Sequence, residues 1–222
     1  MRYVLCLLLA FAVSCNPKVI LNFSGLAGSG QIKVESRAVD LFTAVELGGA
    51  FKVNIGVTDA PTKLELRGDD NLLPHVTVKV ENGVLKLDTD VAVSPSQELA
   101  VTLQTAKLDR LQVSGAGKVH ASGLRGDTFL LRVSGAASVR LAGEVSSTTL
   151  ELSGASSVEA GDLTAARVKI DLSGAGKATV WASESLDVAV SGAGSVVYGG
   201  KPKDVTKKIT GVGVLRADDS MR

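Results

Sequence analysis

Two carboxylates, Glu151 and Asp171, stand at equivalent positions of successive repeats and could act as an acid–base pair. In adjacent strands they would lie near the separation that retaining glycosidases use between their two carboxyl groups. However, Arg132 occupies the same position one repeat earlier, and a guanidinium beside a carboxyl group favours its ionised form. Opposite charges in adjacent strands are also what pairing for stability selects. We therefore predict no catalytic residue, with a carbohydrate-active enzyme (polysaccharide lyase or glycosidase) as the alternative.

Other groups that could support catalysis or hold a metal are scattered. The histidines, His75 and His120, are far apart, so a Ser-His-Asp site would need a serine that the repeat already explains. Each glycine-rich segment is followed by an expected strand, whereas phosphate-binding loops need a helix there. Calcium-binding β-helices carry Asp inside the corresponding turn, and these turns carry Lys, Ser or Val. The sequence predicts no cofactor and no metal ion.

Two aromatic residues form the candidate ligand surface. In the register of the repeat Tyr198 lies one coil after Val180, beside Trp181. Two rings on one edge could stack against a sugar, because an aromatic face offers apolar area with a polar tip. The alternative is that Tyr198 points inward and Trp181 covers a corner.

Two Arg-Gly-Asp tripeptides, at 67–69 and 125–127, match the sequence that integrins read. Gly-Asp is common in turns, so chance explains both copies.

The candidate residues are positioned by a repeat between Leu111 and Ala217. Each copy is centred on Ser-Gly-Ala, or Thr-Gly-Val in the last copy, and the glycines recur at steps of 20, 19, 20, 18 and 19 residues. So short and regular a period is typical of a solenoid in which each repeat forms one coil. The predicted structural corners are Gly115, Gly135, Gly154, Gly174, Gly192 and Gly211.

The segments flanking each glycine alternate apolar and polar residues, as in Leu131-Arg132-Val133, which is the periodicity of a strand. Glycine lets the backbone turn sharply between two strands at little steric cost. The predicted fold class is all-β, a parallel β-helix with about 19 residues per coil; residues 29–217 would hold nine or ten coils. Its outward column reads Gln112, Arg132, Glu151, Asp171, Ala189 and Lys208.

The ends of the repeat region are less regular. Gly48-Gly49-Ala50 is a near copy of the later corners, and Asn82-Gly83 between two alternating runs predicts a local hairpin. Lys201–Lys208 is predicted to be a polar excursion before the last coil, and residues 218–222 a C-terminal tail.

The N-terminus has the features of an export signal. Residues 1–14 carry Arg2 followed by the apolar run Val4–Val13, which is too short to span a bilayer. Small residues precede Cys15, as in the bacterial lipobox, so we expect a lipoprotein signal peptide, lipidation of Cys15 and a lipidated tether at 15–28. An ordinary secretory signal is the alternative. Because Cys6 leaves with the signal, the folded domain has no disulfide.

Charge restricts the possible partners. The formal net charge is +1, with both signs interleaved, which argues against nucleic acid and against a polybasic membrane patch. We expect the N-terminal lipid to be the contact with the membrane, in the bacterial cell envelope at the outer membrane or the periplasmic face. A glycan or an envelope protein is the expected ligand, and the oligomeric state stays open.

The mature chain resembles a bacterial domain family of unknown function, the autotransporter adhesin "head GIN domain". The resemblance rests on Gly28-Ser29-Gly30, Arg37 with Phe42, residues 69–74 (DDNLLP), Leu85-Lys86-Leu87 and the serial Ser-Gly-Ala corners. It implies a right-handed parallel β-helix on an exported, often lipid-anchored protein. The predicted function is a non-catalytic, adhesin-like binding or structural module, with a periplasmic partner of an envelope signalling system as a further alternative.

Overall fold

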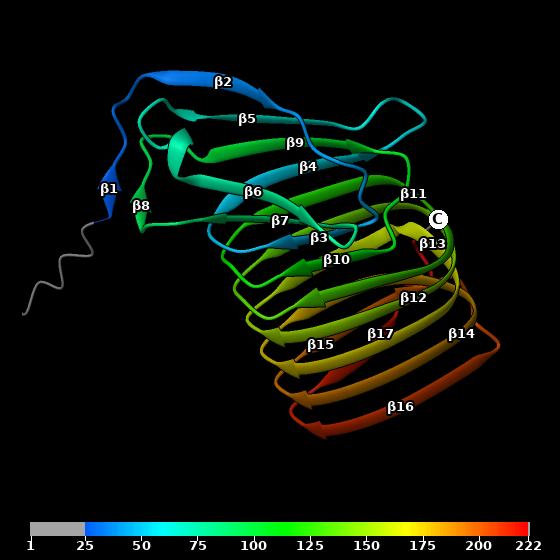
Figure 1. Cartoon of the computed structure of the whole chain (residues 1–222). Coiled ribbons are helices and arrows are strands. Elements are labelled where there is room, and N and C mark those ends of the chain that lie inside the picture. Colours follow the sequence, from blue (N-terminus) through cyan, green and yellow to red (C-terminus); the bar gives the residue numbers. More distant parts are fainter. Residues whose placement is uncertain (1–24, 222) are drawn as a thin grey trace, which may run out of the picture.

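The chain forms a parallel β-solenoid of about 5 turns, which confirms the fold class expected from the repeat (Figure 1). The computed structural model describes residues 25–221. Within that part, the one helical turn is the 3₁₀ segment η1 (Leu73–His75), and no helix is long and apolar enough to cross a membrane.

The strands fall into an irregular N-terminal group and a regular series of coils. The first group is β1 (Leu26–Ala27), β2 (Ile32–Arg37), β5 (Lys63–Asp69), β6 (Val76–Glu81), β7 (Val84–Thr89), β8 (Val93–Ser94) and β9 (Leu99–Thr105). The coils are β3 (Ala44–Leu47), β4 (Phe51–Val57), β10 (Arg110–Val113), β11 (Lys118–Val133), β12 (Ser138–Gly154), β13 (Ser157–Gly174), β14 (Lys177–Gly192), β15 (Ser195–Gly199), β16 (Asp204–Gly211) and β17 (Val214–Ala217).

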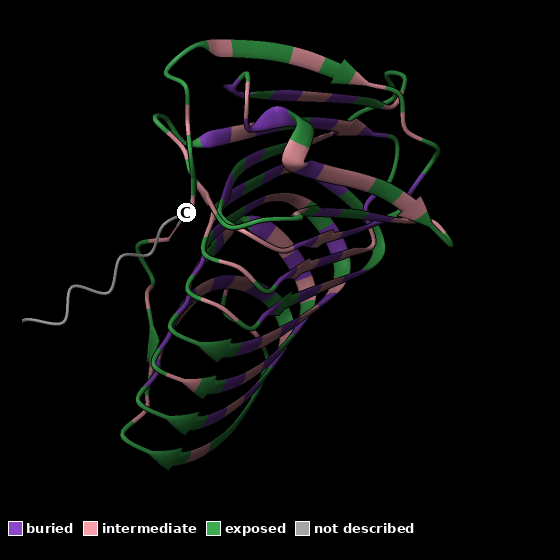
Figure 2. Cartoon of the chain, turned by 60° about the vertical axis from the view of Figure 1, so that its left-hand side comes forward, coloured by how far each residue is buried: buried purple, intermediate pink, exposed green. Residues whose placement is uncertain are grey.

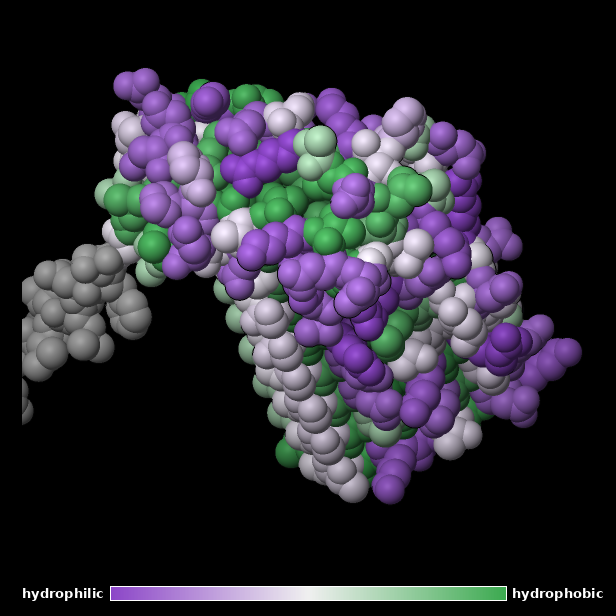
Figure 3. Space-filling view, in the orientation of Figure 1, coloured by the Kyte–Doolittle hydropathy of each residue, from purple (hydrophilic) through white to green (hydrophobic). Residues whose placement is uncertain are grey.

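The coils present two outer faces that meet at the glycine corners. The first face is the outward side of β3, β10, the C-terminal parts of β11–β14, and β16. The second face is the outward side of β4, the N-terminal parts of β11–β14, β15 and β17. In Figure 3 a band of intermediate hydropathy runs along the solenoid edge where the strands of the first face end.

The predicted corner glycines lie directly above one another. Gly154, Gly174, Gly192 and Gly211 are paired in register through β12, β13, β14 and β16. A Cβ on any of the six corner glycines would lie 1.7–2.7 Å from the carbonyl oxygen of the glycine one coil earlier, Gly49 in the case of Gly115. Since real Cβ atoms are not found so close to an oxygen, the stacking of the coils requires glycine at this position.

The core consists of columns of apolar residues contributed by successive coils, and Figure 2 shows the buried residues recurring along each coil. One column, Leu111, Leu131, Leu150, Ile170 and Val188, is fully buried, with no exposed fraction at any position. Apolar burial of this kind is the main favourable contribution to folding.

The expectation of nine or ten coils is wrong, because the N-terminal half forms a cap in place of further coils. After β4 the chain leaves the solenoid, and β5 pairs antiparallel with β2 and β9. The hairpin expected at Asn82-Gly83 is confirmed: β6 and β7 pair antiparallel, and both turn residues have positive φ, as a two-residue type I′ turn requires. The cap covers the start of the first coil, since β9 pairs with β4 and β7 with β3.

Lys201–Lys208 is not an excursion over its whole length. β16 begins at Asp204, in register with Ser185 of β14, so Lys207 and Lys208 belong to the last coil. β16 is the last strand of the stack and has one edge that is unpaired within the described residues, so its side chains are more exposed and more polar than those of the earlier coils. This polar composition is the reason why the sequence did not indicate a strand.

A buried carboxylate fixes the cap. Asp69 is fully buried and accepts hydrogen bonds from the Ser96 hydroxyl (2.6 Å), the Ser96 N–H (2.9 Å) and the Gly30 N–H (2.8 Å). Nearby, Asn71 Oδ1 accepts from the Ser29 N–H at 2.9 Å. These bonds, with the Ser96 hydroxyl first, lower the pKa of Asp69 below its ordinary value of 3.8, against the opposing effect of burial. Asp69 therefore connects two loops that are far apart in sequence.

Replacing Gly154 by valine should destabilise the solenoid. Gly154 has φ +95°, and its Cβ would lie 2.7 Å from the Gly135 carbonyl oxygen. We expect urea denaturation to show a loss of about 1–3 kcal/mol in the free energy of unfolding. Gly56→Val is the matched control, because a Cβ there meets no atom closer than 3.8 Å. Equal stability of the two variants would contradict the stacking argument.

Acid should weaken the cap through Asp69. Because the folded-state pKa of Asp69 is lowered, its contribution to stability is complete above pH 3.8 and is lost as the pH falls through the lower folded value. Asp69→Asn should be less stable than the parent chain at pH 7 and should lose less stability on acidification. Thermal unfolding between pH 2 and 7 measures both effects, with Asp127→Asn, at an exposed position, as control. An unchanged pH dependence in Asp69→Asn would rule out this role.

Candidate functional site

The first face carries the outward column that the repeat predicts. Strand pairing places Gln112 beside Arg132, Arg132 beside Glu151, Glu151 beside Asp171, Asp171 beside Ala189, and Ala189 beside Lys208. Because successive coils pair in parallel, residues about 19 positions apart in the sequence are neighbours on one surface.

The carboxylates of this column are held in ion pairs. Arg132 Nε donates to Glu151 Oε2 at 2.6 Å, and this hydrogen bond is the main reason why the pKa of Glu151 lies below its ordinary value. Lys169 Nζ lies 3.3 Å from Asp171 Oδ2. Glu151 is therefore ionised at neutral pH, whereas a glycosidase general acid needs a raised pKa. The geometry gives no support to the enzyme alternative.

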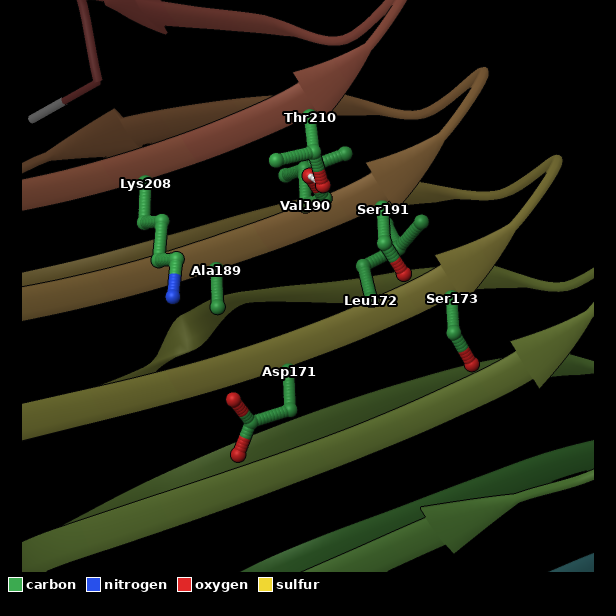
Figure 4. Close-up of a pocket in the computed structure, with 8 residues that line it drawn as sticks. All are labelled: Asp171, Leu172, Ser173, Ala189, Val190, Ser191, Lys208 and Thr210. Atoms are coloured by element: carbon green, nitrogen blue, oxygen red, sulfur yellow. Dashed lines mark hydrogen bonds between the residues drawn. The ribbon is translucent and has the colours of Figure 1, made fainter.

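A hollow of about 300 Å³ opens on this face where Ala189 interrupts the long side chains (Figure 4). Asp171 and Lys208 lie on either side of Ala189, one coil before and one coil after it. The lining residues are Asp171, Leu172, Ser173, Ala189, Val190, Ser191, Lys208 and Thr210. The hollow is an open depression with a cation at one end and a carboxylate at the other.

A second column, of hydroxyl groups, runs along the side of the hollow. Ser173, Ser191 and Thr210 are paired in register, and Thr210 Oγ1 donates to the Val190 carbonyl at 3.4 Å. Within residues 25–221 the hydroxyls of Ser173 and Ser191 and the ammonium of Lys208 have no hydrogen-bond or ion-pair partner. These three groups are available to a ligand that combines hydroxyls with a negative charge.

The second face has a comparable depression of about 290 Å³, and most of its cations are already paired. Lys118 Nζ lies 2.6 Å from Glu98 Oε1, and Arg140 forms an ion pair with Glu159. His120 lines this depression, whereas His75 Nδ1 lies 2.9 Å from Asp90 Oδ1 in the cap, so the histidines are not brought together.

Trp181 and Tyr198 come from neighbouring coils, with Val180 beside Tyr198 and Trp181 beside Gly199. Tyr198 packs against the core, so its ring lies on the inner side of the sheet. Trp181 lies over Gly199 from the outer side: a Cβ on Gly199 would be 2.9 Å from Trp181 Cε3 and 2.9 Å from Met221 Cβ. The two rings do not share a face, and the C-terminal residues return to pack near Trp181. A role for either ring in ligand binding stays a prediction.

The two Arg-Gly-Asp tripeptides differ in their exposure. Asp69 of the first Arg-Gly-Asp is buried, whereas residues 125–127 are exposed and Arg125 pairs with Asp59. No group of three His, Cys, Asp or Glu side chains within residues 25–221 is arranged to hold a metal ion. Cys15, the predicted lipidation site, lies outside the described residues.

Sequence reasoning missed two features that the glycine register could have revealed. Ala189 was placed in the outward column, but its small size as the cause of a hollow was not recognised. Lys207, four residues before Gly211, aligns with Val188, four residues before Gly192, and therefore stands at a core position.

Comparison with known proteins gives one family. A family model described as "Putative auto-transporter adhesin, head GIN domain" matches residues 41–202. A search of curated proteins finds no match.

Solved structures share the fold. A protein from Bacteroides fragilis described as a putative adhesin is 25% identical, with a TM-score of 0.62 over 87% of this chain and 100% of that one. Proteins with the same description from Parabacteroides merdae and Parabacteroides distasonis are 18% and 20% identical, with TM-scores of 0.55 and 0.54; each match covers 87% of this chain and 99% of the other.

Proposed function

The chain belongs to the head GIN domain family of adhesin-like proteins, and we propose that it is a non-catalytic module that binds an acidic carbohydrate at the bacterial cell surface. The family is one of exported, adhesin-like proteins whose function is unknown. The family does not specify a ligand, a binding site or a membrane anchor, and our proposal concerns these three features.

The hollow at Ala189 is the observation that carries the proposal. Lys208 supplies an unpaired cation, and Ser173 and Ser191 supply hydroxyls one coil apart. Adjacent coils are spaced like paired strands, about 4.8 Å apart. A sugar ring presents hydroxyls at comparable separations, and a uronic acid adds a carboxylate that Lys208 can bind with a charge-assisted hydrogen bond.

The electrostatics of the hollow favour an anionic sugar over a neutral one. The carboxylate of Asp171 is already engaged by Lys169 at 3.3 Å, whereas Lys208 has no such partner within the described residues. An open depression of this size fits one or two residues of a longer chain lying on the face, which suits attachment to a polysaccharide and not its cleavage.

We also propose that Cys15 carries the lipid that anchors the protein. The support is the apolar run followed by small residues and Cys at the N-terminus. A lipid at this end would leave the folded domain outside the bilayer and free to present its faces.

Filling the hollow should abolish carbohydrate binding. In a glycan-array screen of the mature chain, we expect binding to uronic-acid-containing oligosaccharides, and Ala189→Trp should lower the affinity by about tenfold or more because the indole occupies the site. Ala100→Trp is the matched control, since Ala100 is a similarly half-buried outward alanine beside Lys52.

Three results would count against this site. They are the absence of any glycan ligand, a preference for neutral sugars, and equal binding by Ala189→Trp and the parent chain. Trp181→Ala belongs in the same screen, because a loss of binding in that variant alone would place the site at Trp181.

Removing the lipidated cysteine should release the protein from the membrane. Cys15→Ser should appear in the soluble fraction after cell lysis, and mass spectrometry should find no acylated N-terminal peptide. Cys6→Ser, within the expected signal peptide, is the control and should leave the mature protein in the membrane fraction. A Cys15→Ser protein that still sediments with membranes would contradict lipid anchoring.

A further inference from the structure

The last coil of the solenoid has one side without a partner. β16 pairs with β14, and β17 pairs with β15; among the strands of residues 25–221, none pairs with their opposite edges. Backbone N–H and C=O groups of β16 therefore face away from the stack at its lower end in Figure 1. An edge of this kind is a template for the addition of another strand.

Apolar core columns end at the same edge. Val205 follows Leu186 in register, and it is 42% exposed where Leu186 is 1% exposed. Ile209 and Leu215 continue two further core columns and are only partly buried. Figure 2 shows the contrast between the buried inner residues of the earlier coils and the largely exposed last coil. The end of the stack therefore offers apolar surface next to a free strand edge.

One core column ends in a charge. Lys207 stands beside Val188, at the end of a column in which the six preceding coil strands, from Val45 to Val188, place fully buried aliphatic side chains, and it is exposed. It has no ion-pair partner within the described residues. A neutral strand added here would bury the Lys207 ammonium without a partner, which costs free energy. An incoming strand must therefore bring a carboxylate to this position.

The charge around the edge points to the same kind of partner. Residues 201–211, which comprise β16 and the segment leading into it, contain four lysines, Lys201, Lys203, Lys207 and Lys208, against one acidic residue, Asp204. Two copies meeting antiparallel through β16 would place Lys207 and Lys208 of each chain close together, and like charges on paired strands are destabilising. The charges disfavour a second copy of this chain and favour an acidic segment.

We propose that the open C-terminal end of the solenoid binds an extended acidic segment of a partner protein, which adds as the next strand beside β16. Its inward side chains are apolar, acidic and apolar, and they meet Val205, Lys207 and Ile209 in that order. Backbone hydrogen bonds supply affinity and the carboxylate facing Lys207 supplies selectivity. This edge adjoins the carbohydrate hollow, because Lys208 and Thr210 of β16 line the hollow. The strand addition is argued from Val205, Lys207 and Ile209 and does not depend on carbohydrate binding.

A pair of synthetic peptides tests the proposal. SVTETLSG follows strand alternation and places Val, Glu and Leu opposite Val205, Lys207 and Ile209, and SVTKTLSG differs in that one charge. In fluorescence anisotropy with the full-length chain, we expect the Glu peptide to bind about tenfold more tightly than the Lys peptide. N-methylation of alternate peptide nitrogens should abolish binding, because it removes the backbone donors that strand addition needs.

Variants of the edge identify the contact. Lys207→Glu should reverse the preference between the peptides, and Lys207→Gln should remove it. Lys33→Glu makes the same charge change on β2, in the cap, and should alter neither affinity.

Four outcomes would overturn the proposal. They are no binding of the Glu peptide at millimolar concentration, equal binding of both peptides, no effect of Lys207→Glu, and full binding of the N-methylated peptide. Self-association of the parent chain that blocks the peptide, seen by sedimentation, would mean that a second copy occupies the edge.

Discussion

The close contact between successive glycine corners is the constraint on which the rest of the structure depends. Each corner carbonyl occupies the space where the next coil would carry a Cβ, so the coils approach only because six positions lack one. This contact fixes which residue of one coil lies above which residue of the next. Inward columns then form the core, and outward columns give each face a defined order of side chains.

Function on such a scaffold is carried by departures from the repeat. Several outward charges pair with a neighbour one coil away, as Arg132 does with Glu151 and Arg140 with Glu159, and paired charges leave little for a ligand. Ala189 departs from the pattern by being small, and a hollow forms. Lys207 differs from the rest of its apolar column by being charged, and in our proposal this charge makes the end of the stack selective for an acidic segment. Both sites are single substitutions in an otherwise regular series.

The glycine register predicted the coils well and the cap poorly, for a physical reason. Within residues 111–217 every strand pairing joins residues about 19 apart, so the position of Glu151 beside Arg132 and Asp171 follows from counting. The cap depends on the buried Asp69 and on antiparallel pairing of β5 with β2 and β9, and no period encodes those partners. The local Asn82-Gly83 hairpin was the exception. The same register places Ala189 between Asp171 and Lys208, so the position of the hollow could have been found by counting, whereas its depth depends on how the neighbouring side chains lie.

The insertion of the cap strands between the first two coils has a consequence for the order of folding. Ala44 pairs with Arg110, 66 positions later, whereas Arg110 pairs with Leu130, 20 positions later. Closing a long loop costs more chain entropy than closing a short one, and contacts between distant residues form more slowly. The C-terminal coils can therefore assemble by successive addition of neighbours. In contrast, β3 and β4 pair on one side with β10 and β11, which are separated from them in the sequence by the whole cap. During synthesis on the ribosome β3 and β4 can pair with β7 and β9 as soon as the cap has emerged, but their other edges stay unpaired until β10 and β11 follow.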